Sequence, residues 1–281
     1  MEAYNEYGRK TNESYRFISS PDNDKIRLIN KLGRKKYRDK RGEFVIEGIN
    51  LVRAALSKAQ HIKFVLISDD FDYGDIADEL AEGVEYRNIY LIPRYLFDKI
   101  SDAENGSGIM AVVDKRSYSL KTITSLEPIG TGNILVLDRL QDPGNIGTMI
   151  RTAVATGYSV VATLKGTADI YSPKVLRASA GMIFGISVIE LADAEELKGL
   201  VSVLDKKIVV TDPREGCPYY ECNLEKDIAL IIGNEGNGIS DEIMECSDVR
   251  VTIPMQGEVE SLNAAICASI LMYEAIRAAE G

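Results

Sequence analysis

The chain has 281 residues, with 45% hydrophobic and 27% charged side chains, an ordinary globular balance that fits one large or two medium domains. No apolar stretch approaches the roughly 20 residues of a membrane span, and the start MEAYNEYGRK lacks the apolar core of a signal peptide, so we expect a cytoplasmic protein. The single histidine, His61, excludes HExxH zinc chemistry, and we predict a structural role for it and no bound metal. The cysteines at 217, 222, 246 and 267 match neither a CxxC pair nor a disulfide framework, which predicts free thiols.

The net charge of −10 hides an asymmetry along the chain. Residues 1–60 carry 14 Lys+Arg against 8 Asp+Glu, so their net charge is +6 and that of the remaining residues is −16. The basic residues concentrate in KIRLINKLGRKKYRDKR, residues 25–41, with nine Lys or Arg against one Asp. Such a run is either a solvated face or a surface that binds phosphate.

The amino-terminal part has the pattern of a small α/β unit. The helical spacing of Ile26, Ile29 and Leu32 predicts a basic helix over residues 25–41. Short apolar runs then alternate with helical patterns, one of which has Pro93 at its first position. The predicted strands are 44–46, 64–67, 89–92 and 109–113, and the predicted helices are 50–58, 75–82 and 93–100. A polar stretch near 114–132 is the predicted linker, which places the domains at 1–118 and 119–281.

The carboxy-terminal part repeats the alternation with strands that are apolar throughout. Strands buried on both faces and separated by helices predict a parallel sheet, and therefore an α/β fold. Ser172 followed by Pro173 predicts the start of a helix, and Gly181 predicts its end. The predicted strands are 134–137, 160–163, 183–189, 208–211, 228–232 and 249–253.

Three loops that follow these strands carry unusual residues, at the carboxyl ends where α/β sheets bind ligands. In NILVLDRLQDPGNIGTMIRTAVATG a Pro-Gly turn leads into a helix with Asn145 and Arg151, although a capped helix with a surface arginine is the simpler interpretation. The loop in IALIIGNEGNGIS reads GxxGxG, unlike the GxGxxG of dinucleotide folds, and contains Glu235, which has no evident packing role. In VRVTIPMQGEVESLNAAICASILMYEAIRAA, Ser261 and Asn263 lie at a helix start, where such residues are normally caps. The second and third loops would lie side by side if their strands were neighbours.

The motifs DPGNIGTMIRTA, IIGNEGNGIS and IPMQGEVESLNAA, in this order, resemble those of the SpoU, or TrmH, family of RNA ribose 2′-O-methyltransferases in the SPOUT superfamily. The resemblance extends from residue 133 to about residue 278. The amino-terminal unit, with KIRLINKLGRKKYRDKRGEFVIEG and ENGSGIMAVV, looks like the substrate-binding domain of many members, which is similar to ribosomal-protein-type RNA binders. The resemblance implies S-adenosylmethionine as cofactor, a trefoil knot in the parallel-sheet domain, and a homodimer with the active site at the subunit interface.

The resemblance also implies roles for individual residues. The positions that match the catalytic cluster of the family are Asn145, Arg151, Glu235, Ser261 and Asn263. The positions implied to bind the cofactor are Thr211, Gly233, Asn234, Ile253, Met255 and Leu262. For the basic run, the residues expected to bind RNA are Lys31, Arg34, Lys35, Lys36, Arg38, Lys40 and Arg41.

The expected reaction is a direct displacement, in which a ribose 2′-oxygen attacks the methyl carbon of a sulfonium, so the enzyme mainly has to align the reactants. Because this domain contains no histidine, an imidazole base is impossible. In this family the arginine, here Arg151, is usually assigned as the base, but an arginine side chain is effectively always protonated. A guanidinium that grips an RNA phosphate is the alternative, and the sequence leaves both roles open.

The expected substrate is structured RNA, with 23S ribosomal RNA favoured and transfer RNA as the alternative. A catalytically silent RNA-binding protein on the same scaffold is the main alternative from another class. A nucleotide-dependent oxidoreductase is disfavoured because GxGxxG is missing after the first strand of either unit.

Overall fold

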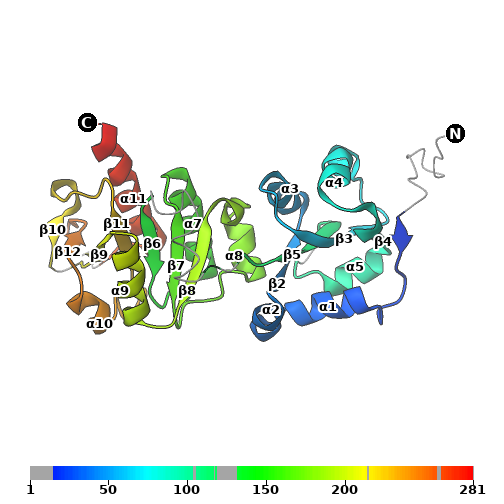
Figure 1. Cartoon of the computed structure of the whole chain (residues 1–281), viewed down its shortest axis with the longest axis horizontal. Helices are drawn as coiled ribbons and strands as arrows, with labels where there is room; N and C mark the ends of the chain where they lie inside the picture. Colours follow the sequence, from blue (N-terminus) through cyan, green and yellow to red (C-terminus); the bar gives the residue numbers. More distant parts are fainter. Residues whose placement is uncertain are drawn as a thin grey trace. The chain divides into compact units, whose positions relative to one another are not determined.

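The structure is a computed structural model, and it describes residues 15–103, 106–116, 118, 132–213, 215–257 and 261–280. The chain forms two compact units, residues 1–115 and 116–281, whereas the sequence predicted a boundary after residue 118. Most of the predicted linker at 114–132 lies outside the described residues. Figure 1 shows that each unit has its own sheet with helices packed on it.

The first unit has a mixed five-stranded sheet in the order β1-β4-β3-β5-β2, in which β5 runs antiparallel to both of its neighbours. Its strands are β1 (Arg16–Phe17), β2 (Glu43–Glu47), β3 (Ile62–Ser68), β4 (Ile89–Ile92) and β5 (Ile109–Asp114). Its α-helices are α1 (Asp24–Leu32), α2 (Lys35–Arg41), α3 (Ile49–Ser57), α4 (Ala77–Gly83) and α5 (Arg94–Ile100), with 3-10 turns η1 (Gly74–Ile76) and η2 (Tyr86–Asn88). Helices α1 and α5 share a buried apolar cluster with β3, β4 and β5.

The basic segment 25–41 is two helices, which corrects the prediction of one continuous helix. Helix α1 ends at Gly33, and Arg34 has an extended backbone with φ −109° and ψ 132°. Arg38 of α2 then turns inward, and its Nη1 donates a hydrogen bond of 2.6 Å to the carbonyl of Leu32 at the end of α1. The break therefore lets a guanidinium satisfy a carbonyl that the helix end leaves unpaired.

The second unit has a seven-stranded sheet in the order β10-β12-β9-β11-β6-β7-β8, and every pairing in it is parallel, as predicted. Its strands are β6 (Ile134–Leu137), β7 (Val160–Leu164), β8 (Ser187–Leu191), β9 (Lys207–Thr211), β10 (Cys217–Pro218), β11 (Ile228–Ile232) and β12 (Val249–Thr252). Its helices are α7 (Pro143–Ala155), α8 (Pro173–Ala178), α9 (Ala194–Val203), α10 (Asp241–Glu245) and α11 (Ala264–Glu280), with 3-10 turns η3 (Met182–Gly185) and η4 (Tyr219–Glu221).

Three local predictions in the alternating pattern need correction. The strand predicted at 183–189 begins only at Ser187, because η3 occupies the preceding residues. Pro93 is the residue before the first turn of α5, with an extended ψ of 144°, and is not the first helical residue. Ser172 does precede α8, but its side chain makes no capping hydrogen bond. No helix in the described part of the chain has the length and apolar character of a membrane span.

The strand order reverses between β6 and β11, which are neighbours in the middle of the sheet. From β6 the chain proceeds to β7 and β8 on one side, whereas β9 and β12 lie on the other side of β11. The loops after β6 and β11 therefore diverge at a topological switch point, where open α/β sheets leave a crevice for ligands. The loops after β11 and β12 do not come from neighbouring strands, because β9 lies between them.

Candidate active site

The first functional segment is the start of α7, which the sequence caps strongly. Asp142 precedes the helix, and its carboxylate accepts a hydrogen bond of 2.7 Å from the backbone N–H of Asn145, while Pro143 occupies the first turn. The apolar face of α7 buries Ile146, Met149 and further residues, and the helix packs beside α8 and α11. The half-buried Asn145 side chain thus lies in the first turn of the helix that follows β6.

The second segment is the loop from Gly233 to Ser240, which follows β11. Asn234 holds it together: its Oδ1 accepts hydrogen bonds of 3.0 Å from the N–H groups of Gly236 and Asn237, and its Nδ2 donates one of 2.9 Å to the carbonyl of Arg139. At Gly233 a Cβ would lie 2.5 Å from backbone atoms of Gly238 and Ile239, so the loop closes tightly only over a glycine. The loop leaves the side chain of Glu235 exposed at its outer turn.

The third segment is the start of α11. Asn263 caps this helix, because its Oδ1 accepts hydrogen bonds from the N–H groups of Ala265 at 2.9 Å and Ile266 at 3.3 Å. Residues 258–260, which precede this turn, lie outside the described residues. The cap uses only the side-chain oxygen of Asn263, and its amide nitrogen contacts the first segment instead.

The three segments meet in one chain of side-chain hydrogen bonds. Asn263 Nδ2 donates to Asn145 Oδ1 at 3.0 Å, and Asn145 Nδ2 donates to Glu235 Oε1 at 3.0 Å. Each asparagine thereby uses its oxygen and its nitrogen in a defined orientation, and the carboxylate of Glu235 is held at the end of the chain. We name these three residues the polar triad. Because Glu235 is exposed, its second oxygen can accept a hydrogen bond from a ligand hydroxyl.

The remaining predicted catalytic residues, Arg151 and Ser261, are not bonded to the polar triad. Arg151 lies further along α7, is exposed, and makes no hydrogen bond or ion pair with the described part of the chain. Ser261 is exposed two residues before Asn263. The structure thus joins three of the five predicted residues through direct contacts and leaves the other two facing solvent.

The predicted cofactor residues follow three consecutive strands of the sheet, β12, β9 and β11. Thr211 ends β9, Gly233 follows β11, and Ile253 and Met255 follow β12, so they lie at the same carboxyl edge. These residues and Leu262 are half-buried. The remaining candidate, Asn234, uses its side chain to hold its own loop, and its backbone N–H and C=O are paired with those of Gly238, so its role in the structure is to shape the loop.

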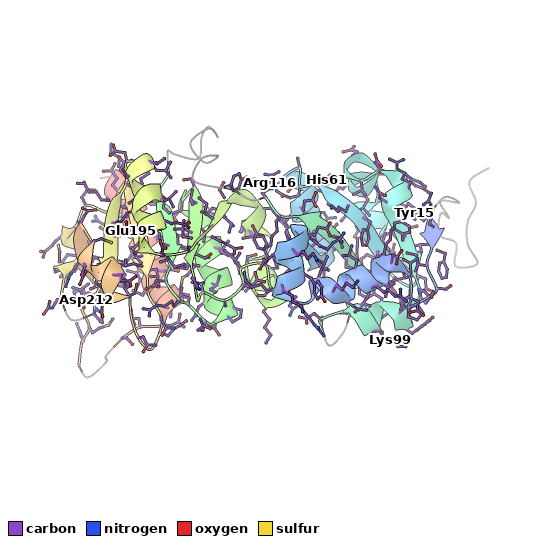
Figure 2. All side chains as sticks on the ribbon, turned by 60° about the horizontal axis from the view of Figure 1, so that its bottom comes forward. Tyr15, His61, Lys99, Arg116, Glu195 and Asp212 are labelled. Carbon is purple, nitrogen blue, oxygen red and sulfur yellow. The ribbon has the colours of Figure 1, made fainter. Side chains whose placement is uncertain are left out.

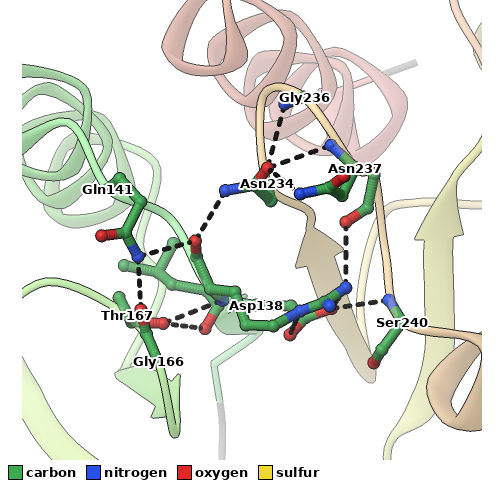
Figure 3. A network of polar contacts seen from close by, with 11 residues as sticks. Asp138, Gln141, Gly166, Thr167, Asn234, Gly236, Asn237 and Ser240 are labelled. Atoms are coloured by element: carbon green, nitrogen blue, oxygen red, sulfur yellow. Dashed lines mark hydrogen bonds and ion pairs between the residues drawn. The ribbon is translucent and has the colours of Figure 1, made fainter.

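A polar network around Asp138, which the sequence did not single out, connects the loops after β6, β7 and β11 (Figure 3). The Asp138 carboxylate is only 3% exposed and accepts hydrogen bonds from the N–H of Ser240 at 2.7 Å and from Arg139 Nε at 3.1 Å. Thr167 joins the same network by accepting from the N–H of Arg139 at 3.0 Å. The only feature of the sequence that could have indicated a role for Asp138 is its position directly after an apolar strand.

The histidine and the cysteines take no part in this site. His61 lies at the surface of the first unit, where its Nδ1 is 2.6 Å from Asp114 Oδ2 (Figure 2). The thiol nearest to the polar triad in sequence is Cys267, and burial raises its pKa to about 11, which keeps it protonated at neutral pH. All four cysteines are free thiols. Among the described residues, no three His, Cys, Asp or Glu side chains are grouped to hold a metal ion.

The predicted RNA-binding residues divide into a buried member and exposed ones. Arg38 is 4% exposed and holds the end of α1, so we withdraw it from the predicted RNA surface. Arg41 pairs with the buried carboxylate of Glu43 at 2.7 Å, and Lys35 lies 3.4 Å from Asp39. The six exposed members are Lys31, Arg34, Lys35, Lys36, Lys40 and Arg41.

The fold and site define a two-unit protein whose parallel-sheet unit carries a polar triad at the carboxyl edge of its strands. Residues 132–273 match the model of the SpoU rRNA Methylase family, and residues 23–111 match that of the MRM3-like substrate binding domain. The chain belongs to the SpoU rRNA Methylase family.

Relatives over nearly the whole chain agree with this assignment. The 23S rRNA (guanosine(2553)-2′-O)-methyltransferase RlmP of Bacillus subtilis is 34% identical over 91% of this chain and 97% of its own length. The 23S rRNA (uridine(2479)-2′-O)-methyltransferase of Streptomyces viridochromogenes is 30% identical over 88% of this chain and 86% of its own.

Solved structures match the fold over nearly the whole chain at lower sequence identity. The SpoU methyltransferase AviRb from Streptomyces viridochromogenes, in complex with the cofactor AdoMet, has a TM-score of 0.83 and 26% identity over 92% of this chain and 99% of its own. An AdoMet-bound rRNA methyltransferase from Sinorhizobium meliloti has a TM-score of 0.81 and 27% identity over 94% and 98%.

Proposed function

We propose that the protein transfers a methyl group from S-adenosylmethionine to a ribose 2′-hydroxyl of 23S ribosomal RNA. The observation that carries the proposal is the polar triad, because it joins the three motif segments of the family at one edge of the sheet. The relatives named above act on 23S rRNA at a 2′-oxygen, which favours this RNA over transfer RNA. A silent RNA-binding protein would have no use for a carboxylate held in place by two asparagines.

The residues at the carboxyl edge of β9, β11 and β12 suit the cofactor. The loop closes tightly at Gly233 beside the half-buried apolar side chains of Ile253, Met255 and Leu262, and apolar surface of this kind suits an adenosine. Gly233, Ile253 and Leu262 would surround the adenosine through their backbone, with Thr211, Asn234 and Met255 at the periphery. When bound, S-adenosylmethionine supplies an electrophilic methyl group.

The polar triad then acts on the ribose. Asn263 fixes Asn145, and Asn145 fixes Glu235. The free carboxylate oxygen of Glu235 accepts a hydrogen bond from the 2′-hydroxyl, which aligns the hydroxyl oxygen for attack, and it takes up the hydroxyl proton as the new C–O bond forms. The exposed guanidinium of Arg151 carries five donors in a planar fork and stays charged, so we assign it to the RNA phosphate beside the target ribose. Ser261, exposed two residues before Asn263, would orient the hydroxyl.

We further propose a homodimer that completes the site. Helix α11 leaves Ile266 and Tyr273 53% and 55% exposed at a spacing of two helical turns, and α7 packs beside it through the contact of 3.1 Å between Thr152 and Ser269. Two copies that bury this apolar face would bring Arg151 of one subunit toward the polar triad of the other. Light scattering at micromolar concentration should give twice the mass of the chain, and a monomer would contradict the proposal.

Two finer features of the fold belong to the same proposal. We expect a trefoil knot in the parallel-sheet unit, around the cofactor site, as the resemblance implies. We also expect the first unit to bind RNA as ribosomal-protein-type domains do, through the exposed basic residues of α1 and α2. Charge-neutral substitutions of Lys31, Lys36 and Lys40 should weaken RNA binding and flatten its salt dependence, and an unchanged salt slope would contradict this surface.

The substrate class is tested by incubating the protein with methyl-labelled S-adenosylmethionine and unmodified 23S rRNA, 16S rRNA or transfer RNA. We expect label in 23S rRNA alone, and none when Asn145 is replaced by Ala. Label in transfer RNA would identify the alternative substrate. Cofactor binding without transfer to any RNA would favour the silent RNA-binding protein.

A further inference from the structure

We propose that a cleft at the switch point between β6 and β11 binds the nucleotide next to the methylated one, and that it selects a base with an exocyclic amino group. The inference rests on the proposed function, because it assigns part of the RNA to this cleft. The cleft has a volume of about 480 Å³ and is lined by residues that follow β6, β7, β8 and β11. None of the predicted cofactor or catalytic residues lines it.

The interior of the cleft combines an apolar floor with a polar rim. Leu164, Ile239 and Ile243 form the floor and are 6%, 8% and 2% exposed. Asn237 and Ser240 bring polar groups to the rim. A flat heterocyclic base needs this combination of apolar surface and directed polar atoms, and the volume lies within the roughly 300–1,000 Å³ of small-molecule pockets.

One side of the cleft is cationic. Arg139 is fixed there, because its Nε donates to buried Asp138 at 3.1 Å and its Nη2 donates to the carbonyl of Gly238 at 3.4 Å (Figure 3). Its side chain remains 39% exposed, and its Nη1 makes no hydrogen bond with the described residues. Lys165, after β7, is exposed and has no hydrogen bond or ion pair within the described part of the chain. Together they offer donors for the phosphate of a nucleotide.

The other side of the cleft is acidic, and its carboxylates are not equivalent. The carboxylate of Asp138 already accepts hydrogen bonds from Ser240 and Arg139, and that of Asp193 accepts one of 3.0 Å from the N–H of Glu196. Asp241 and Glu242, in the first turn of α10, are exposed and make no such contact among the described residues. A free carboxylate accepts hydrogen bonds from the exocyclic amino group of cytosine, adenine or guanine. Uracil has no exocyclic amino group, and its two carbonyl oxygens, which flank N3, would repel the carboxylate.

The loop after β11 connects the cleft to the polar triad. Asn237 on the rim lies two residues after Glu235, and two residues span at most about 7 Å. An RNA strand whose target ribose contacts Glu235 therefore has its adjacent nucleotide at the mouth of the cleft. The cleft would then contribute to the choice of the methylated site without touching the reacting atoms.

Mononucleotide binding tests the cleft directly. CMP and UMP are titrated into the full-length protein saturated with S-adenosylhomocysteine, which keeps nucleotides out of the cofactor site. We expect CMP to bind at least about fivefold more tightly than UMP, and Lys165→Ala to weaken CMP binding about tenfold. The double variant Asp241→Asn, Glu242→Gln should abolish the preference for CMP over UMP. The control is Lys226→Ala, an exposed lysine at the opposite end of β11, which should bind as the wild type does. Absent CMP binding, or equal binding by wild type and Lys165→Ala, would overturn the proposal.

Kinetic assays of methyl transfer to 23S rRNA show whether the cleft binds the substrate RNA or only free nucleotides. Lys165→Ala should raise KM for the RNA about tenfold and leave kcat unchanged, whereas Lys226→Ala should change neither. If KM stays at the wild-type value, the cleft does not hold substrate RNA and the inference is wrong, although the proposed function stands. If the wild type methylates no RNA, the proposed function fails, and the CMP titration still decides whether the cleft binds a nucleotide.

Discussion

The side chain of Asn263 donates a hydrogen bond of 3.0 Å to that of Asn145, across 118 positions of the sequence. The same Asn263 caps α11 through its oxygen, so one side chain both starts the helix and orients the site. Under the proposed function, stability and catalysis depend on different atoms of this one residue, so substitutions can separate the two effects.

The substitution Asn263→Asp should lower the rate of methyl transfer without unfolding the protein. Aspartate caps a helix as well as asparagine does, so the free energy of unfolding should stay within about 0.5 kcal/mol of the wild type. It cannot donate to Asn145 Oδ1, so methyl transfer should fall at least about tenfold. Asn263→Ala should lose activity and also about 1 kcal/mol of stability. Denaturant unfolding and transfer of labelled methyl groups measure the two effects, and full activity of Asn263→Asp would show that the polar triad is not needed.

Two glycines of the loop after β11 should respond differently to alanine. A Cβ at Gly233 would lie 2.5 Å from backbone atoms of Gly238 and Ile239, whereas at Gly236 the nearest atom, Asn234 Oδ1, is 3.6 Å away. Gly233→Ala should therefore lower the free energy of unfolding by about 1–3 kcal/mol and weaken cofactor binding, while Gly236→Ala leaves both unchanged. Calorimetric titration with S-adenosylmethionine checks this pair. Equal affinities of the two variants would contradict the tight closure over Gly233.

Substitution of Arg151 distinguishes a phosphate clamp from a base. If Arg151 is a phosphate clamp, Arg151→Lys keeps the charge but loses the planar fork, so kcat/KM should fall about tenfold. Arg151→Ala loses both the charge and the fork, and kcat/KM should fall at least about a hundredfold. The pH dependence of kcat/KM should be the same in Arg151→Lys as in the wild type. A pH–rate profile that shifts when lysine replaces arginine would instead make Arg151 the base.

The free energy of unfolding of the first unit should fall at acid pH, because Glu43 becomes protonated. Burial raises the pKa of this carboxyl, but hydrogen bonds from Arg41 and Lys63 and their charges lower it further, so that the pKa lies below its ordinary value of 4.5. A lowered pKa means that the stabilisation is complete above about pH 4.5 and is lost as the pH falls through the folded-state value. Urea unfolding between pH 6 and 3 should show this loss. Glu43→Gln should flatten the dependence, and the exposed Glu82→Gln control should not.

The sequence predicted the elements well and the contacts between them only in part. The predicted bounds of β4, β6 and β11 agree with the structure, because apolar runs between turn residues have local causes. The motifs named Asn145, Glu235 and Asn263, but no local pattern shows which atoms of distant side chains meet. Arg38 was placed on the RNA surface because a dense basic run looks uniformly exposed, whereas the break at Gly33 turns this one side chain inward. The burial of Asp138 likewise depends on three loops that only the folded sheet brings together.

The position of the transferred methyl group tests the central claim most directly. A methyl group on a ribose 2′-oxygen removes the hydroxyl that alkaline cleavage of RNA requires, so labelled 23S rRNA treated with alkali should release its label in one dinucleotide that resists cleavage. The same RNA treated with the Asn145→Ala variant should carry no label. Label released in mononucleotides would place the methyl group on a base and contradict the assignment of the polar triad to ribose chemistry.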